Sequence, residues 1–475
     1  MNRALVALLA LAASACSFAP AYQRPEVAIP PEHRFAPPGE TTPIADLGWW
    51  QVFRDPVLQG LIKEALESNQ DLALAVARVQ EARAFLGVAR ADFYPQVNGT
   101  ANATYGQQYS KNYLPGSRET GNYALAAGLS WELDLWGRVR NASAAASADL
   151  LAAEDTRHAV VLSLVSGVAQ AYLELRELDL ELQIAQTNTG LRQGTLSLFE
   201  ARAKGGIASD LEVNQARSDL AVTTAAIPST QLAIAQKEHQ LCVLLGRPPG
   251  PIARGAALVD TPVPPTLPAG VPAQLLTRRP DLLASEQGVM AAGSRVGVAV
   301  ANRLPVISLT GLIGLNSTQT SNLFSADSLV WNAGGGLLAP IFQGGRLKSQ
   351  EEAARAQLEQ AVAVYKKAVQ VALGEVADAA AGTRWLRDVR AARTEQVKAT
   401  TAATKLALAR YEGGVSSYLE VLDAQRQQFD SELSLAQSQR DELTSVVQLY
   451  RALGGGWQEP PAEPAPTAAP PPPAH

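Results

Sequence analysis

Three carboxylates and a phenol lie around two Gly–Gly pairs and carry the most suggestive chemistry in this 475-residue chain. Glu420 and Asp423 lie three residues apart after Gly414, Tyr411 precedes that glycine, and Glu212 follows the other pair. Carboxylates accept hydrogen bonds and attract cations, and a phenol can donate a hydrogen bond. A lone carboxylate near a turn is usually a solvated surface charge, so the role of these groups depends on the elements around them.

Motifs of enzymatic sites are absent from the sequence. It has no GxxxxGK[ST] phosphate loop, no HExxH zinc motif and no GxSxG nucleophile motif. The four histidines are scattered without the spacing of metal ligands. We therefore expect no enzyme, and no catalytic, cofactor-binding or metal-binding residues. The net charge of −5 leaves no basic surface, so nucleic acid is not an expected partner.

The N-terminus has the features of a cleavable export signal that ends at a cysteine. Met1–Arg3 supplies one positive charge, Ala4–Ala12 is a short apolar run, and small residues lead to Cys16. This pattern resembles a bacterial lipoprotein signal, in which residues 1–15 are removed and Cys16 becomes an acylated N-terminus. Ser17 fits delivery to the outer membrane. The alternative is an ordinary signal peptide that contains a cysteine.

The elements that position the carboxylates form two copies of one unit. An offset of 208 residues pairs Gly206 with Gly414 and Glu212 with Glu420, and the register holds over more than a hundred residues. Such a register indicates a duplicated supersecondary unit. The predicted segments are an N-terminal segment 16–55, a first repeat 56–247, a linker 248–271, a second repeat 272–456 and a Pro/Ala-rich disordered tail 457–475.

Each copy is predicted to begin with a helical stretch, Pro56 to about Ala91 in the first, and to contain a very long helical hairpin. Residues 138–204 and 346–410 lack proline, the residue that breaks helices, and each stretch turns at a Gly–Gly pair and returns. Within Val161–Ala185, apolar residues repeat at alternating spacings of three and four, as in packed coiled-coil helices. Some 65 residues at 1.5 Å each make a rod about 100 Å long, which predicts an elongated assembly.

Before each hairpin lie two segments in which every second residue is apolar or small. Such alternation over about ten residues is typical of membrane β-barrel strands, although a soluble half-buried strand has the same pattern. The long polar loops between these segments favour membrane strands over soluble ones. Four strands cannot close a barrel, and open edges are not tolerated in lipid, so several chains must combine. The segments are residues 97–105, 123–135, 307–315 and 329–341.

Seven stretches, taken in order, resemble the TolC/OprM-like outer-membrane efflux proteins, in the lipoprotein (NodT-type) branch, over essentially the whole mature chain. The resemblance implies a mainly α fold with membrane β: a homotrimer whose strands form one outer-membrane β-barrel that continues into a long periplasmic α-helical barrel. Segments 16–55 and 248–271 would belong to its equatorial region. The matching stretches are Gly48–Trp50, Phe53–Pro56, Asn69–Leu72, Leu244–Gly250, Arg278–Leu282, Gln343–Leu347 and Arg410–Ala424.

The function implied by the resemblance is passive conduction. A channel of this family carries drugs or other small solutes from an inner-membrane pump, usually of the resistance-nodulation-division type, through a periplasmic adaptor to the outside. The alternative is an outer-membrane duct for protein secretion, fed by a type I secretion pump. A soluble periplasmic coiled-coil scaffold is a third interpretation, and the four strand segments argue against it.

The resemblance also assigns roles to the residues near the two turns. It implies that Glu420 and Asp423 face inward and form carboxylate rings at the periplasmic end. Tyr411 matches a residue whose hydroxyl latches neighbouring coils, and Glu212 is its expected partner, while Ser416 stands where the family often has a basic residue. Both glycines of each pair are expected to have positive φ. The tips expected to dock the adaptor comprise Gly205, Gly206, Gly413, Gly414 and Ser417.

Overall fold

The computed structural model describes residues 17–35, 44–108, 118–261 and 271–457. The predicted signal peptide 1–15, Cys16, part of the linker and all but the first residue of the predicted tail lie outside the described residues. Within them, the chain forms two compact units, and each is described by itself. The sheet unit comprises Met1–Glu26, Ala77–Glu154 and Ala284–Lys367, and the hairpin unit comprises Val27–Val76, Asp155–Leu283 and Ala368–His475.

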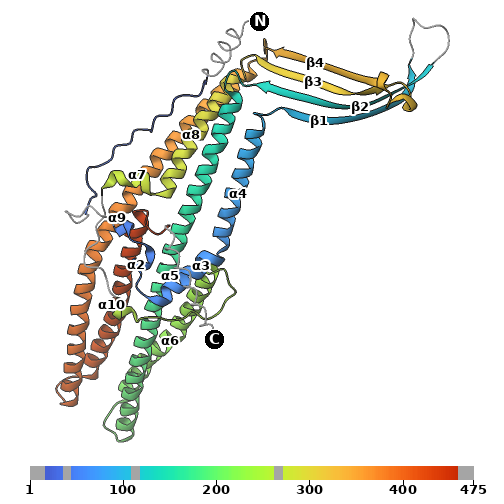
Figure 1. The fold of residues 1–475 in the computed structure, drawn as a ribbon. Coiled ribbons are helices and arrows are strands. Elements are labelled where there is room, and N and C mark those ends of the chain that lie inside the picture. Colours follow the sequence, from blue (N-terminus) through green and yellow to red (C-terminus); the bar gives the residue numbers. More distant parts are fainter. Residues whose placement is uncertain (1–16, 36–43, 109–117, 262–270, 458–475) are drawn as a thin grey trace, which may run out of the picture. The chain divides into compact units, whose positions relative to one another are not determined.

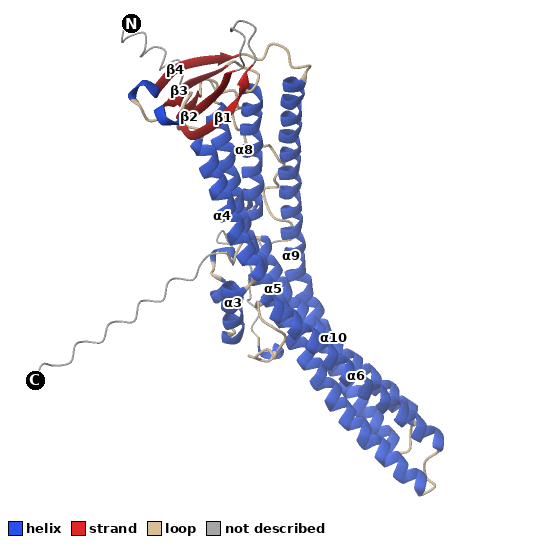
Figure 2. Cartoon of the chain, turned by 90° about the vertical axis from the view of Figure 1, so that its right-hand side faces the viewer, coloured by secondary structure: helices blue, strands red, loops and turns tan. Residues whose placement is uncertain are grey.

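The sheet unit carries one antiparallel sheet with strand order β1-β2-β3-β4 (Figure 2). All four predicted strands are confirmed, and β4 ends three residues before the predicted end because Pro340 has no N–H for the ladder. In the described residues, β1 and β4 pair on one side only. The strands are β1 (Gln96–Gln108), β2 (Arg118–Leu133), β3 (Val306–Ser317) and β4 (Leu329–Leu338).

The register of the sheet separates an apolar face from a face of polar and small residues. Odd-numbered residues pair with odd-numbered residues throughout, as in Gly99–Ala127, Ala127–Ile313 and Ile313–Trp331, so they share one face. The odd face includes Val97, Tyr123, Leu125, Leu129, Trp131, Leu309, Ile313, Leu329 and Trp331. The even face includes Asn98, Thr100, Asn102, Thr104, Gly128, Ser130, Thr310, Gly314 and Asn332, with Val306, Leu312, Val330 and Leu338 as its large apolar members.

The helices repeat with the predicted offset and form two long hairpins, α5 with α6 and α9 with α10, which Figure 1 shows. Both long helices, α5 and α9, have 67 residues and both returning helices, α6 and α10, have 35, and the 208-residue offset relates all four of their boundaries. The longer helices are α3 (Pro56–Ser68), α4 (Gln70–Ala91), α5 (Arg138–Lys204), α6 (Asp210–Leu244), α8 (Pro280–Ala301), α9 (Arg346–Glu412) and α10 (Tyr418–Ala452). The short ones are η1 (Ile44–Asp46), α2 (Trp49–Val52), η2 (Leu258–Asp260), η3 (Pro272–Gln274), α7 (Leu275–Arg278), η4 (Thr320–Asn322) and η5 (Ala326–Ser328).

The predicted helical stretch 56–91 is two helices rather than one. Asn69 has ψ 131°, an extended conformation that ends α3, and its side-chain oxygen accepts the N–H of Leu72 at 2.9 Å to cap α4. The Asn69 amide also donates to the carbonyl of Leu244, at the end of α6, at 2.9 Å. The backbone of Asn69 therefore ends one helix, while its side chain starts the next and holds the returning helix of the first repeat.

The core of the hairpin unit lies along the predicted seam of α5. Leu164, Val168, Ala171, Leu175 and Ala185 are buried, as the alternating spacing of three and four indicates. The described residues include one helix, α5, that is long and apolar enough to cross a membrane by length and composition, and more than half of its apolar window is buried. Such burial is typical of a core helix.

Candidate functional site

The two hairpin tips turn in the same way (Figure 1). Gly206 and Gly414 have φ of 72° and 71°, the left-handed region that favours glycine. Gly205 and Gly413 do not have positive φ, so that prediction is wrong for the first glycine of each pair. Each first glycine instead donates its N–H to the carbonyl four residues earlier, at 3.2 and 3.0 Å, and completes the last helical turn.

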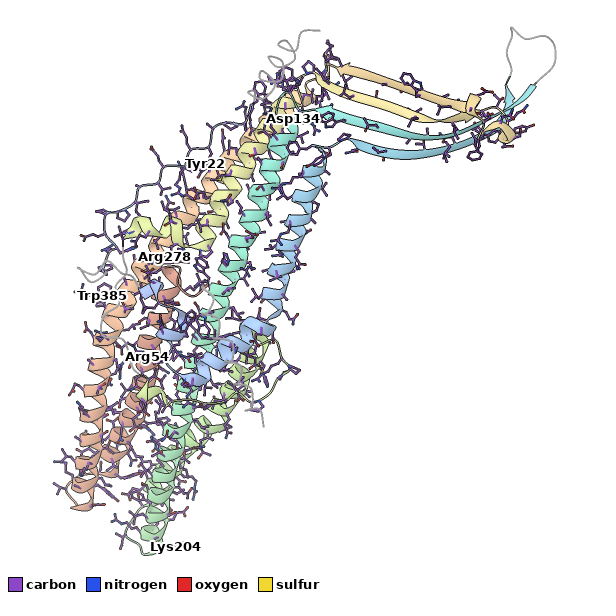
Figure 3. All side chains as sticks on the ribbon, in the orientation of Figure 1. Tyr22, Arg54, Asp134, Lys204, Arg278 and Trp385 are labelled. Atoms are coloured by element: carbon purple, nitrogen blue, oxygen red, sulfur yellow. The ribbon has the colours of Figure 1, made fainter. Side chains whose placement is uncertain are left out.

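Each tip presents two apolar side chains to solvent. Ile207 and Leu211 in the first tip, and Val415 and Leu419 in the second, are 60–80% exposed. The 208-residue offset relates the two pairs. Figure 3 labels Lys204, the last residue of α5, at the first tip. Exposed apolar groups at equivalent places in both repeats are a feature of interaction surfaces.

The first tip closes with a reciprocal cap. Ser209 is the N-cap residue of α6, and its hydroxyl accepts the N–H of Glu212 at 3.3 Å. The Glu212 carboxylate in turn accepts the N–H of Ser209 at 2.8 Å and its hydroxyl at 3.0 Å. Two donors at the start of α6 are thereby satisfied. Within this chain, Glu212 therefore serves its own helix and does not contact Tyr411.

The second tip has an equivalent serine and glutamate but a different set of bonds. Ser417, the N-cap residue of α10, makes no side-chain capping bond. Instead, the Glu420 carboxylate accepts the Nε–H of Arg410 at 3.3 Å, and both side chains are about half exposed. The neighbouring Ser416 hydroxyl and the Arg410 guanidinium hold the pKa of Glu420 below its usual value. Asp423, also exposed, accepts a bond from the neutral amide of Gln427 at 2.7 Å.

Tyr411 lies in an aromatic cluster that both hairpins share. Its ring centroid is 5.7 Å from that of Phe199 and 5.5 Å from that of Tyr418, and Phe199 and Tyr418 are 4.2 Å apart. Burial raises the pKa of Tyr418 well above its usual value. Residues from all four hairpin helices complete this core: Leu196, Val213, Ala216, Ala407, Val421 and Leu422.

Within one chain, the hydroxyl of Tyr411 and the carboxylate of Glu212 have separate partners. The partner of the Tyr411 hydroxyl in the first repeat is Arg202, whose Nη1 donates to it at 3.3 Å. The Arg202 guanidinium also lies 5.7 Å from the Tyr411 ring centroid. Glu212 is held by the cap of α6, where Ser209 offers it two donors at 2.8 and 3.0 Å.

An ion pair lies buried between the helices of the first hairpin, and sequence reasoning missed it. Arg192 Nε is 3.0 Å from the carboxylate of Asp219, and their side chains are only 3% and 2% exposed. Arg426 of the second hairpin reaches the same carboxylate at 3.3 Å. Burial lowers the pKa of Arg192, although Asp219 opposes that shift. The signal in the sequence was Arg192, a charged residue that lies where the apolar seam of α5 would continue beyond Ala185.

The segment that follows Cys16 is fixed to the sheet unit. We call residues 17–26 the strap. The Ser17 hydroxyl donates to the side chain of Asn141, in the first turn of α5, at 3.1 Å. A Cβ on Gly297 of α8 would lie 2.5 Å from Asn141 Nδ2 and 2.9 Å from the Ala19 side chain, so glycine is required for this approach. Ser17 therefore lies close to the junction of β2 and α5.

A buried carboxylate clamps the middle of the strap. Glu286 of α8 has a side chain only 7% exposed, and it accepts the Tyr22 hydroxyl at 2.5 Å and two N–H groups of Arg24 at 2.8 Å each. Burial and the Glu286 carboxylate raise the pKa of Tyr22 to about 12. Figure 3 labels Tyr22 on the strap. Charge-assisted and bidentate bonds of this kind are the strong ones, so the strap is firmly held.

No group of three or more His, Cys, Asp or Glu side chains that could hold a metal ion occurs in the part of the chain that the structure describes. The tips instead bring together carboxylates, arginines and a phenol from both repeats. Such groups can bind and steer ions and can hold helices together.

Comparisons with known proteins identify the family of the chain. The family model of outer membrane efflux proteins matches the chain twice, over residues 61–247 and 271–455. The cation efflux system protein CusC of Escherichia coli O6:H1 is 35% identical over 458 residues, which cover 95% of this chain and 98% of CusC. The solvent efflux pump outer membrane protein SrpC of Pseudomonas putida is 34% identical over 456 residues, which cover 93% of this chain and 96% of SrpC.

A solved structure, that of the outer-membrane channel OprN, superimposes with a TM-score of 0.87 at 31% identity and covers 94% of this chain and 100% of OprN. The predicted fold class, a mainly α chain that contributes strands to an outer-membrane β-barrel and long hairpins to a periplasmic α-helical barrel, is confirmed. With both repeats matched by the family model and nearly the whole chain aligned to efflux channels, the chain belongs to the outer membrane efflux protein family and is a channel subunit of the cell outer membrane.

Proposed function

We propose that the chain is one subunit of a homotrimeric channel that receives drugs or other small solutes from an inner-membrane pump through a periplasmic adaptor. The observation that carries this proposal is the sheet: one face is apolar, the other is polar or small, and both outer strands lack a second neighbour within the described chain. Open edges are not tolerated in lipid, so copies of the sheet must pair with one another. Three copies would give a closed barrel of twelve strands.

The even face of the sheet supports a duct of broad specificity. Amides, hydroxyls and small residues predominate, and a charged member, Glu132, is paired with Arg138 at 2.7 Å. The described residues of this face thus show no cluster of charges that would select one solute. CusC is named for cations and SrpC for solvents. For this chain we propose that the pump, which we expect to be of the resistance-nodulation-division type, chooses the solute.

The tips are the proposed docking surface for the adaptor. Four exposed apolar side chains, including Leu211 and Leu419, accompany Gly205, Gly206, Gly413, Gly414 and Ser417. Burial of such groups against a partner is favourable, at roughly 25 cal/mol per Å² of apolar surface. Equivalent patches on both hairpins would give the trimer six contact points around its opening.

The gate is proposed to lie at the same end. Glu420 and Asp423 would form two carboxylate rings in the trimer, and a ring of negative charge at a narrow opening attracts cations and repels anions. Tyr411, held by Arg202, would help keep the two hairpins of each chain together in the closed state. Glu212 would contribute by fixing the start of α6.

The proposed lipid anchor is Cys16. Its neighbour Ser17 is bonded to Asn141, near the end of a membrane strand, which would bring an acyl chain to the periplasmic surface of the outer membrane. Labelled palmitate should enter the wild type and not Cys16→Ser. Equal labelling of both would remove the anchor from the proposal.

Conduction provides the first test. Purified protein in detergent should run as a trimer by light scattering, and in planar bilayers it should conduct with a preference for cations. Glu420→Ala combined with Asp423→Ala should weaken that preference while the trimer stays intact. A stable monomer that conducts would overturn the assembly, and unchanged selectivity would remove the gate.

Efflux provides the second test. Co-expression with a pump and adaptor in cells that lack their own channel should lower the accumulation of a fluorescent efflux dye. Leu211→Asp combined with Leu419→Asp should abolish this effect and leave bilayer conductance unchanged, because only adaptor docking is lost. A channel that restores protein secretion through a type I pump but not dye efflux would favour the alternative function.

A further inference from the structure

Three residues of the first tip have identical counterparts in the second. The pairs are Arg202 and Arg410, Ser209 and Ser417, and Glu212 and Glu420. The two serines also share their backbone conformation, with φ of −84° and −77° and ψ of 155° in both. Local sequence and backbone therefore offer both glutamates the same helix cap. Since one glutamate uses this cap and the other does not, the difference must come from their neighbours.

The arginine of the first tip is engaged by an aromatic residue. Arg202 lies over the ring of Tyr411 and donates to its hydroxyl. A guanidinium is attracted to the face of an aromatic ring. Because Arg202 lies on the ring of Tyr411, it does not pair with the carboxylate of Glu212. Glu212 therefore remains on the cap of α6.

The arginine of the second tip meets no equivalent ring. The residue that corresponds to Tyr411 in the first repeat is Ala203, which has neither a ring nor a hydroxyl. Arg410 bonds to Glu420 instead, and Ser417 is left without a side-chain cap. Because the two repeats differ at this position, with Tyr411 in one and Ala203 in the other, Arg410 bonds to the carboxylate of Glu420 and not to an aromatic ring.

We propose that Arg410 determines the ionic selectivity of the periplasmic entrance by neutralising Glu420. This inference rests on the proposed gate, in which Glu420 and Asp423 line that entrance. Asp423 is bonded to the neutral Gln427, so its charge is not offset there. One guanidinium therefore compensates one of the two carboxylates of each chain and halves their formal negative charge.

The test is the reversal potential of single channels in planar bilayers under a potassium chloride gradient. Arg410→Gln should raise the cation-to-anion permeability ratio about twofold or more, because the uncompensated carboxylates focus a stronger negative field at a narrow opening. Arg410→Lys keeps the charge and should keep the wild-type ratio. Adding Glu420→Gln to Arg410→Gln restores the original net charge and should return the ratio toward that of the wild type.

The chain offers a matched control. Arg217 pairs with Glu200 on the first hairpin at 3.1 Å, and both groups are exposed to a similar degree as Arg410 and Glu420. Arg217→Gln removes the same charge from a pair outside the proposed gate and should leave the ratio unchanged. An equal rise in this variant would overturn the proposal, because the loss of any exposed arginine would then raise the permeability ratio.

An unchanged ratio in Arg410→Gln trimers would also overturn it. The Glu420→Ala, Asp423→Ala variant then separates two kinds of failure. If that variant still lowers the ratio, the gate stands and the role of Arg410 alone is wrong. If it has no effect either, the gate itself lies elsewhere.

Discussion

The two hairpins have the same lengths and the same turns, yet different groups hold each of them together near its tip. In the first hairpin, Arg192 and Asp219 form a buried ion pair. In the second, the equivalent positions are Thr400 and Gln427, and the Thr400 hydroxyl instead bonds to the hydroxyl of Ser431 at 2.8 Å. The two repeats have thus kept the same backbone, while the side chains between their helices differ.

This difference has a mechanical consequence. A buried charge that loses its partner costs several kcal/mol, whereas one hydroxyl bond contributes about 1 kcal/mol. We therefore expect the first hairpin to be the fixed member of the pair. The second hairpin, which carries Tyr411, Glu420 and Asp423, is then the member that moves when the channel opens.

The largest difference between the two hairpins is expected at the ion pair. Arg192→Met keeps the length of the side chain but leaves Asp219 buried with only Arg426 beside it, and should lower the free energy of unfolding by about 3 kcal/mol. Thr400→Val at the equivalent position should cost about 1 kcal/mol. Urea denaturation in detergent, followed by helical circular dichroism, measures both. Equal costs would break the comparison between the hairpins.

A pH effect should follow from the contact between the hairpins. Burial raises the pKa of Glu177 on α5 to about 7, although Arg440 on α10 opposes the shift at 3.1 Å. The folded state therefore holds a proton that the unfolded state loses near pH 4.5. The stabilising contribution is complete below pH 4.5 and is lost as the pH rises to about 7, with an upper limit of about 1.4 kcal/mol per pH unit.

Thermal unfolding between pH 4.5 and pH 7 tests this effect in the wild type and in Glu177→Gln. The glutamine variant cannot titrate, so the difference between the two proteins should grow as the pH rises. A difference that stays constant across this window would show that Glu177 does not hold the proton.

A smaller difference is expected at the helix caps. Ser209→Ala breaks the reciprocal cap of α6 and should cost about 1 kcal/mol. Ser417→Ala removes a hydroxyl that makes no capping bond and should cost close to nothing. Comparing the two melting temperatures would sharpen the contrast, and an equal loss would mean that the second cap also forms in solution.

The smallest effect concerns the latch. Tyr411→Phe removes a hydroxyl that accepts one bond from Arg202 at 3.3 Å, worth at most about 0.5 kcal/mol in this partly exposed place. Open probability in planar bilayers should rise about twofold with selectivity unchanged. A change of selectivity would instead place the hydroxyl among the groups that act on ions.

Pattern alone predicted the elements well. Apolar residues recur at every second position in the strands and at spacings of three and four in the helices. These patterns run over many residues without interruption, so the strands and the two 67-residue helices could be located from the sequence. The break at Asn69 was missed because its signal is a single side chain that caps α4. The strap was missed as well, since an extended segment has no period and its clamp, Glu286, is distant in sequence.

The bonding at the tips could not be predicted from the sequence. Ser209 with Glu212 and Ser417 with Glu420 have the same spacing, which predicts a cap in both cases. The outcome differs because Tyr411 engages one arginine and no ring engages the other, a choice made by neighbours in space. The positions of the gate residues therefore came from resemblance, while their partners came from the structure.

The pairing of odd with odd residues in all four strands limits how the membrane part of the chain can change in length. An insertion of one residue into any strand would exchange the lipid-facing and lumen-facing side chains beyond that point. Two residues inserted together would preserve the faces and lengthen the strand by about 7 Å. Engineers who wish to match this channel to a thicker bilayer should therefore add residues in pairs, and in every strand at once.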